Sequence, residues 1–192
     1  MIYEFLADRI VSLDIEGDGG KPSLPIEVGI CEAYPDMGKL REWKIRPIRR
    51  ISPFATKIHG LRNSHLNDAP IIEEVSEEIL SSLQGALIVG HAVRDDLRCL
   101  ERSIPSLPRF NAVDTLPMSR QLIPGLPSYS LTTVAGAMGI TIENIGRGPH
   151  SAGYDARVGA ELFLRLCLQP GAETYLRGTG FPIPRTSRSF SP

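Results

Sequence analysis

The chain has 192 residues, and its 21 Lys and Arg against 22 Asp and Glu give a formal net charge of −1. This length fits one domain with a sizeable hydrophobic core, and the near-neutral charge argues against a protein that coats long nucleic acid by electrostatics alone. No stretch has the apolar length of a membrane span, and the first residues lack the basic head of a signal peptide.

The N-terminal half alternates apolar runs with turn residues, which predicts strands followed by a helix. We expect strands over 9–14, 26–33 and 40–45, separated by glycine- and proline-containing turns. An amphipathic helix is predicted over 71–83. Its apolar stripe consists of Ile71, Ile72, Val75, Ile79, Leu80 and Leu83.

The C-terminal half alternates helices with short strands. A buried strand is predicted over 86–89, a helix from about Asp96 to Arg102, and a strand over 110–113. Ser130 can cap a helix that ends near Gly139. A last helix over 152–168 is apolar on most sides, so it should be packed deeply with its charged stripe facing outward. That stripe is Arg157, Glu161 and Arg165.

This order of elements predicts an α/β fold with a central mixed β-sheet flanked by helices. We expect one domain over 1–177 and a flexible tail rich in Gly, Pro, Ser and Arg over 178–192. Cys31, Cys99 and Cys167 are scattered and do not form metal-ligand pairs. They are interpreted as buried thiols of a protein in the reducing cytoplasm.

A basic stretch overlaps the predicted strand over 40–45 and continues to Arg50. Five cations face the single acid Glu42 between positions 40 and 50, namely Arg41, Lys44, Arg46, Arg49 and Arg50. The stretch is interpreted either as an edge that contacts a nucleic acid backbone or as an ordinary solvated strand and loop.

Acidic and histidine residues gather in three separate blocks. In extended chain Asp14 and Glu16 point the same way, on either side of Ile15. The second block is His91 with Asp95 and Asp96, at the start of a helix. The third is His150 and Asp155, where a glycine-rich loop leads into the last helix.

Together the blocks favour metal-dependent phosphodiester hydrolysis. Carboxylates that meet at one point repel one another unless cations lie among them. A histidine beside them can accept a proton near neutral pH. Asp95 and Asp96 compete for the ligand role in the second block, and His91 is better explained as a structural hydrogen-bond partner than as a ligand.

The blocks resemble the motifs of the DnaQ-like, or DEDDh, family of 3′–5′ exonucleases, which have a ribonuclease-H-like fold. The likeness covers about Arg9 to Leu168. It rests on Leu13-Asp14-Ile15-Glu16, Ile26-Glu27-Val28-Gly29-Ile30, Ala55-Thr56-Lys57-Ile58-His59-Gly60-Leu61, Gly90-His91 with Asp96, Val113-Asp114-Thr115-Leu116, Ser130-Leu131 and His150 to Asp155. The five-residue offset from His91 selects Asp96 over Asp95.

The resemblance implies a two-metal-ion mechanism. Asp14, Glu16, Asp96 and Asp155 would hold two Mg²⁺ or Mn²⁺ ions, and His150 would act as the general base. The expected activity releases nucleoside 5′-monophosphates from the 3′ end of single-stranded DNA or RNA. A homodimer and a polymerase-associated subunit are both compatible with the family, and no membrane is involved.

The sequence departs from the family pattern around the substrate. After the first motif stand Gly17, Asp18, Gly19 and Gly20, where relatives carry threonine or serine, glycine and an apolar residue. Ala92 and Asp95 replace a frequent asparagine and phenylalanine. We assign Gly17, Asp18, Gly19, His59 and His91 as candidate substrate-binding residues, with a turn as the default role of Asp18.

Two other functions compete with the exonuclease hypothesis. A catalytically impaired nucleic-acid-binding or scaffold protein on the same fold would keep the site and lose turnover through the altered loop at 17–20. A nucleotide-binding Rossmann domain is disfavoured, because the glycines of this loop do not follow the G-x-G-x-x-G spacing.

Overall fold

The computed structural model describes residues 7–141 and 147–179 of the chain, so the predicted tail from Gly178 lies almost wholly outside the described residues. Five strands form one sheet in the order β3-β2-β1-β4-β5. The pairs β1–β2 and β2–β3 are antiparallel, whereas β1–β4 and β4–β5 are parallel. The strands are β1 (Ile10–Gly17), β2 (Pro25–Tyr34), β3 (Leu40–Lys44), β4 (Leu87–Gly90) and β5 (Ala112–Asp114).

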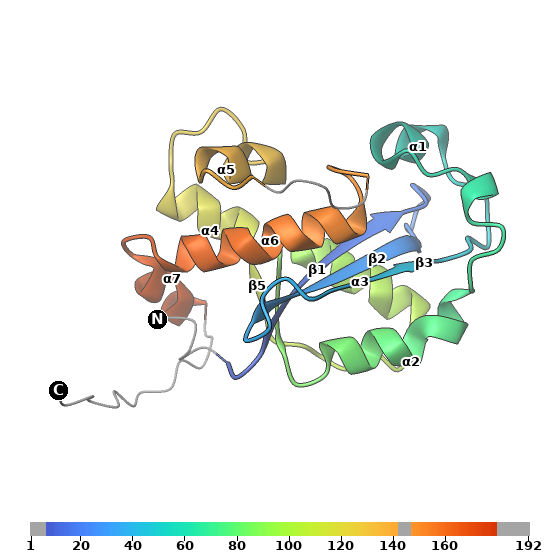
Figure 1. The fold of residues 1–192 in the computed structure, drawn as a ribbon, viewed down its shortest axis with the longest axis horizontal. Coiled ribbons are helices and arrows are strands. Elements are labelled where there is room, and N and C mark those ends of the chain that lie inside the picture. Colours follow the sequence, from blue (N-terminus) through green and yellow to red (C-terminus); the bar gives the residue numbers. More distant parts are fainter. Residues whose placement is uncertain (1–6, 142–146, 180–192) are drawn as a thin grey trace.

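Helices cover both faces of this sheet (Figure 1). They are α1 (Pro53–His59), the 3₁₀-helix η2 (Asn63–His65), α2 (Ile72–Leu83), α3 (Val93–Ser103), α4 (Thr115–Leu122), α5 (Leu131–Ala137), α6 (Ala152–Cys167) and α7 (Ala172–Gly178). The mixed sheet between helices confirms the predicted fold class. Among the described residues, no helix is long and apolar enough to cross a membrane.

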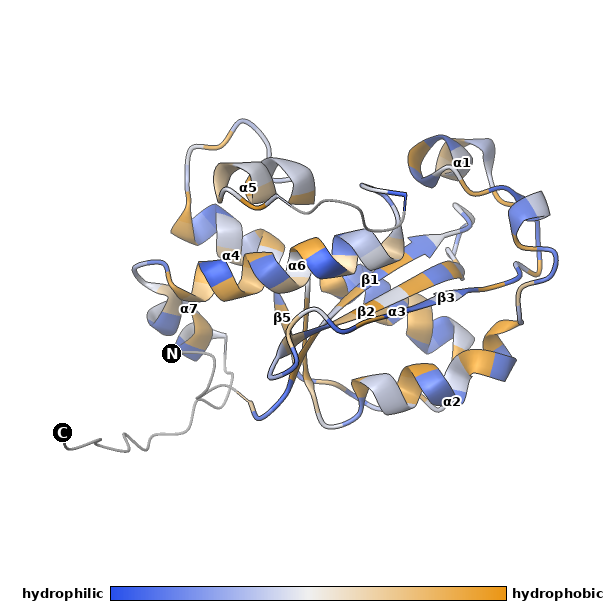
Figure 2. Cartoon of the chain, viewed as in Figure 1, coloured by the Kyte–Doolittle hydropathy of each residue, from blue (hydrophilic) through white to orange (hydrophobic). Residues whose placement is uncertain are grey.

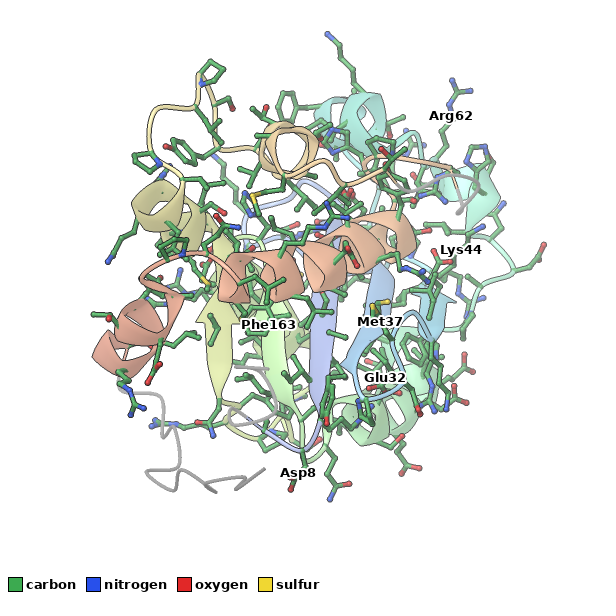
Figure 3. All side chains as sticks on the ribbon, turned by 60° about the vertical axis from the view of Figure 1, so that its left-hand side comes forward. Asp8, Glu32, Met37, Lys44, Arg62 and Phe163 are labelled. Atoms are coloured by element: carbon green, nitrogen blue, oxygen red, sulfur yellow. The ribbon has the colours of Figure 1, made fainter. Side chains whose placement is uncertain are left out.

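The core lies in two layers, one on each side of the sheet. On the α6 side, Phe163 is fully buried between helix and sheet and packs in a cluster with residues of α4, α5 and α7 (Figure 3). On the other side, α2 and α3 pack against alternate residues of β1, such as Val11 and Leu13. The hydropathy colours of Figure 2 show the corresponding apolar stripe on α2.

Helix α6 approaches the sheet very closely because glycines line the contact. A Cβ at Gly29 of β2 would lie 2.2 Å from the backbone oxygen of Ala152. A Cβ at Gly153 would meet the Glu42 side chain, and one at Gly159 would meet Ser12 Oγ at 2.6 Å. This contact brings the first turn of α6 against the ends of β1 and β2, where the candidate site lies.

The sequence predictions agree with most of the regular elements. The charged stripe of α6 is half-exposed as expected, with Arg165 paired to Glu161 at 2.9 Å, while Arg157 instead donates to the backbone oxygen of Gly38. Helix α3 begins at Val93, three residues before the predicted start, and β1 extends beyond Asp14 to Gly17. The short elements α1, η2, α4 and α7 were not predicted.

We expect Gly29→Ala to destabilise the protein strongly. The new methyl group has backbone rather than a movable side chain in its way, so α6 must shift, at a cost of about 1–3 kcal/mol or more. Thermal or urea unfolding measures the decrease in the free energy of unfolding. Gly136→Ala is the matched control, because its methyl group would meet open space in α5, and it should stabilise by about 0.5–1 kcal/mol. Equal effects of the two substitutions would contradict the close packing of α6.

Candidate active site

The candidate site lies where the carboxyl ends of three parallel strands meet. β1, β4 and β5 run in the same direction, so Glu16, Gly90 and Asp114 come to one edge of the sheet. Open α/β sheets bind ligands at this edge. Helices α3 and α6 begin beside it and bring Asp96 and Asp155 from sequence positions far from β1.

Glu16, His150 and Asp155 form the tightest group. One potential ligand atom from each lies within 4.8 Å of the other two. Asp155 is in the first turn of α6, and its Oδ2 accepts a hydrogen bond of 3.1 Å from the backbone N–H of His150. The exposed His150 has a φ of 62°, so the loop places it in the left-handed region just before the helix.

Asp14 and Asp96 lie outside the group of Glu16, His150 and Asp155 whose ligand atoms are within 4.8 Å, but they interact with it electrostatically. Burial raises the pKa of Asp14 well above its usual range, and the charges of Asp96, Asp155 and Glu16 raise it further. Asp96 is half-buried, whereas Asp95 is exposed and pairs with Arg98 at 3.3 Å on the surface. The structure therefore turns Asp96, rather than Asp95, toward the other carboxylates.

Every carboxylate of this cluster is harder to ionise than a free one. Burial, followed by the charges of Asp155 and Glu27, raises the pKa of Glu16 to about 7. Burial likewise raises the pKa values of Asp96 and Asp155, although the backbone N–H and the ring of His150 partly offset this for Asp155. Four acids that all resist ionisation mark a place with excess negative charge, which a divalent cation would neutralise.

A fifth carboxylate, Glu27, lies directly beside the cluster and forms an ion pair with Arg147. It is fully buried in β2, opposite Glu16 in the strand register. Arg147 donates to both of its oxygens, at 2.9 and 2.7 Å, and the backbone N–H of Ala152 donates to Oε2 at 3.1 Å. Glu27 thus fixes both ends of the segment that carries His150. Local sequence patterns do not predict this role, because Glu27 and Arg147 are 120 residues apart.

Asp18 is a structural residue of the turn that follows β1. Its buried carboxylate accepts hydrogen bonds from the backbone N–H groups of Gly20 and Leu24, at 2.9 and 3.0 Å, and pairs with the Arg49 guanidinium. Burial raises the pKa of Asp18, but these hydrogen bonds outweigh it and the net shift is downward. Because Arg49 balances the charge, Asp18 does not add free negative charge near the site.

His91 supports the turn from which α3 starts. Its Nδ1 lies 3.0 Å from Thr115 Oγ1, and its Nε2 lies 2.7 Å from the carbonyl oxygen of Tyr129. Nearby, Asp114 Oδ1 accepts a hydrogen bond of 2.9 Å from the N–H of Ala92, which has a φ of 67°. Both ring nitrogens of His91 therefore already have protein partners, and the segment that includes Asp114 and Thr115 orients the start of α3.

His59 has an unused donor beside the site. Its Nδ1 accepts the backbone N–H of Leu61 at 3.0 Å, so in the neutral ring Nε2 carries the proton. Nε2 is buried and has no hydrogen-bond partner among the described residues. Burial lowers the pKa of His59, and the charges of Arg147 and His150 lower it further, against the raising effect of the Gly17 backbone and Glu27.

Comparison with known proteins agrees with this geometry. The exonuclease family RNase_T matches residues 17–163, a span that includes Asp96, His150 and Asp155. The chain belongs to the DnaQ-like exonuclease family. The matched span includes the motifs at 90–96 and 150–155 and begins just after the motif at 13–16.

Several curated relatives are bacterial nucleases or polymerases. The chain is 29% identical over 171 residues to the DNA polymerase III subunit epsilon of Rickettsia prowazekii, covering 82% of this chain and 73% of that protein. It is 27% identical over 166 residues to the 3′-5′ exonuclease DinG of Bacillus subtilis, covering 82% of this chain. The chain spans 17% of DinG and 9% of a PolC-type DNA polymerase III from Caldanaerobacter subterraneus, so it corresponds to one part of these larger proteins.

Solved structures share the fold at low sequence identity. Exonuclease X in complex with 5′ overhanging duplex DNA has a TM-score of 0.70 and 23% identity, over 91% of this chain and 95% of that one. The nuclease domain of 3′hExo, a DEDDh family member bound to rAMP, has a TM-score of 0.68 and 14% identity, over 94% and 97% of the chains. These likenesses show the ribonuclease-H-like fold.

We expect Arg147→Gln to destabilise the protein more than Glu27→Gln does. The first leaves a fully buried carboxylate without its cation beside Glu16, whereas the second leaves a half-exposed arginine. The loss for Arg147→Gln should be about 2–3 kcal/mol, below the roughly 3–5 kcal/mol of a wholly buried pair, because Arg147 is 37% exposed. Urea unfolding of both single variants and the double variant measures their coupling.

Arg177→Gln is the matched control for this pair. It breaks an exposed ion pair with Glu173 in α7, so the free energy of unfolding should change by less than about 0.5 kcal/mol. If Arg147→Gln is as mild as Arg177→Gln, the Glu27–Arg147 pair does not hold the His150 segment in place.

Proposed function

We propose that the protein is a metal-dependent 3′–5′ exonuclease that hydrolyses the terminal phosphodiester bond of nucleic acid and releases nucleoside 5′-monophosphates. The observation that carries this proposal is the meeting of Glu16, His150 and Asp155 within 4.8 Å at the carboxyl end of β1, close enough to Asp14 for the charges of Glu16 and Asp155 to raise its pKa. Membership of the exonuclease family supports the same class of reaction.

The side chains fit divalent cations with oxygen ligands. Asp14, Glu16, Asp96 and Asp155 would hold two ions of Mg²⁺ or Mn²⁺, hard cations that prefer carboxylate oxygen. When bound, the ions would supply charge neutralisation and Lewis acidity at the phosphate undergoing hydrolysis. The raised pKa values of all four acids support this assignment, because the charges of Arg147 near Glu16 and of His150 near Asp155 offset the effect of burial only in part.

His150 would accept the proton of the attacking water. Its side chain is exposed beside the cluster, and its backbone N–H is anchored to Asp155 at 3.1 Å, so the imidazole stays near the reacting centre while it exchanges protons with solvent. Arg147 and Glu27 would act as positioning residues, because they hold the segment on which His150 lies.

The 3′-terminal nucleotide would be bound by the loop after β1 and by His59. The buried Nε2–H of His59 needs an acceptor, and a sugar or phosphate oxygen of the substrate would satisfy it. Gly17 and Gly19 would allow the substrate to approach the backbone closely. Asp18 would shape this loop through its ion pair with Arg49. His91 would support the neighbouring turn.

We also propose a substrate, a partner and a cellular compartment. The substrate would be single-stranded DNA or RNA with a free 3′ end, and the likeness to an epsilon subunit favours a polymerase-associated enzyme over an isolated homodimer. The three free cysteines are buried, which suits a reducing compartment such as the cytoplasm.

The direct test is stepwise shortening of labelled single-stranded DNA, single-stranded RNA and duplexes, each with Mg²⁺, Mn²⁺ or chelator. We expect loss of nucleotides from the 3′ end only with metal, and liberation of 5′-monophosphates. His150→Ala should lower kcat by about 10²–10⁴-fold, the range for removal of a general base, while metal binding is retained.

Asp95→Asn is the matched control, because Asp95 neighbours the proposed ligand Asp96 yet lies at the surface, and it should leave kcat within a factor of two. A protein that binds nucleic acid but shortens none of these substrates with either metal would instead be the impaired binding or scaffold protein. Full activity of His150→Ala would remove His150 from its proposed role.

A further inference from the structure

The segment from Arg41 to Arg62 carries seven Lys and Arg residues against a single acid, in a chain that is nearly neutral overall. Four of these arginines differ in whether a neighbouring side chain holds them. Arg41 donates to Ser82 Oγ at 2.7 Å, and Arg49 is held by the buried Asp18. Arg50 and Arg62 are exposed, and neither has a carboxylate partner among the described residues.

These two arginines line the same open groove, about 800 Å³ in volume, next to α1. The lining contains hydroxyl, amide and guanidinium groups and lacks any carboxylate. It consists of Arg50, Ile51, Ser52, Pro53, Thr56, Arg62 and Asn63. Internal hydrogen bonds hold Ser52, Thr56 and Asn63 in place, so the wall of the groove is rigid while the arginines are free to bind.

An exposed aromatic residue lies in the sequence between the groove residues Pro53 and Thr56. Phe54 follows Pro53 in α1 and is 73% exposed, although phenylalanine is a residue that proteins usually bury. Helix α1 lies apart from the sheet at one end of the molecule (Figure 1), and Arg62 projects away from the body of the protein (Figure 3). We call Arg50, Phe54 and Arg62 the α1 face.

The α1 face adjoins the candidate active site through the loop after β1. The backbone N–H of Ser52 donates to the carbonyl oxygen of Asp18 at 2.8 Å. Ser52 Oγ would lie 2.2 Å from a Cβ at Gly19, so groove and loop are in contact. A chain that leaves the site past Gly19 would therefore meet this face first.

We propose that the α1 face binds the part of a single nucleic acid strand that lies internal to its 3′ end. Arg50 and Arg62 contact successive backbone phosphates, and Phe54 stacks against a base, the combination by which proteins bind single strands without sequence preference. The proposal rests on the proposed function for the direction of the strand. The absence of carboxylates from the groove favours a polyanion over a protein partner.

The test compares a 12-nucleotide single strand with a trinucleotide. Binding is measured by fluorescence anisotropy with Mg²⁺ in the His150→Ala background, and hydrolysis in the otherwise native chain. Arg50→Ala with Arg62→Ala should weaken binding of the 12-mer at least about tenfold. It should also lower the slope of log affinity against log salt by about 1.4, the value for two single-strand phosphates.

Phe54→Ala should weaken binding of the 12-mer by about 5- to 150-fold, the range for loss of one stacked base. For all three substitutions, kcat/KM on the trinucleotide should stay unchanged. Arg177→Ala and Leu168→Ala, exposed positions near α7 at the other end of the molecule, are the charge and apolar controls and should leave every value as in the native chain.

The outcomes separate this proposal from the proposed function. If the native chain shortens the 12-mer yet the α1-face variants match their controls, the proposal is overturned and the exonuclease stands. If the native chain does not hydrolyse either substrate while the variants still lose affinity, the proposal stands without the exonuclease. If Phe54→Ala changes the oligomeric state by light scattering and not the affinity, the face belongs to a protein interface and the proposal fails.

Discussion

The burial of four carboxylates at one place, with repulsion among them, is the constraint that the rest of this structure must satisfy. Asp14, Glu16, Asp96 and Asp155 come from one strand and two helices, and each has its pKa raised by burial and, for Asp14, Glu16 and Asp96, by neighbouring negative charges. Bringing these groups together opposes folding. The rest of the fold must therefore contribute enough free energy to hold them at one place, and its most unusual contacts lie next to the cluster.

Those contacts are close backbone packing and a buried ion pair. Gly29 lets the backbone of α6 approach β2 at a distance that a side chain would prevent, and Gly153 leaves room for the Glu42 side chain of β3; this close packing places Asp155. Glu27, joined to Arg147 and Ala152, anchors the loop that carries His150. Glu27 and Gly29 stand two residues apart on β2, so one short strand segment both docks the helix and holds the loop. This strand segment therefore positions residues of the candidate site.

The sequence predicts the parts of the fold that have a strong local pattern. Helix α2 has an apolar stripe and α6 an apolar body, so their limits agree within one residue with the prediction. Helix α1 was not predicted because Phe54 exposes its apolar surface to solvent. Helices α4 and α7 are only eight and seven residues long, and α4 follows β5 without a loop. The pairs Asp18–Arg49 and Glu27–Arg147 join residues 31 and 120 positions apart, for which local pattern carries no signal. The site carboxylates could be recognised from the sequence only because three motifs with the spacing of the family occur in one chain. These are Asp14 with Glu16, His91 with Asp96, and His150 with Asp155.

Stability as a function of pH, with and without Mg²⁺, tests the central claim most directly. Glu16 has a pKa of about 7 in the folded state, against 4.5 for a glutamate in its ordinary state, so the folded chain holds more protons than the unfolded one between pH 4.5 and 7. The metal-free protein should therefore lose stability as the pH rises from 5 to 8, and Mg²⁺ should restore it most at the upper end. Stability that is flat or rising over this range without metal, with no effect of Mg²⁺ at pH 8, would contradict the account.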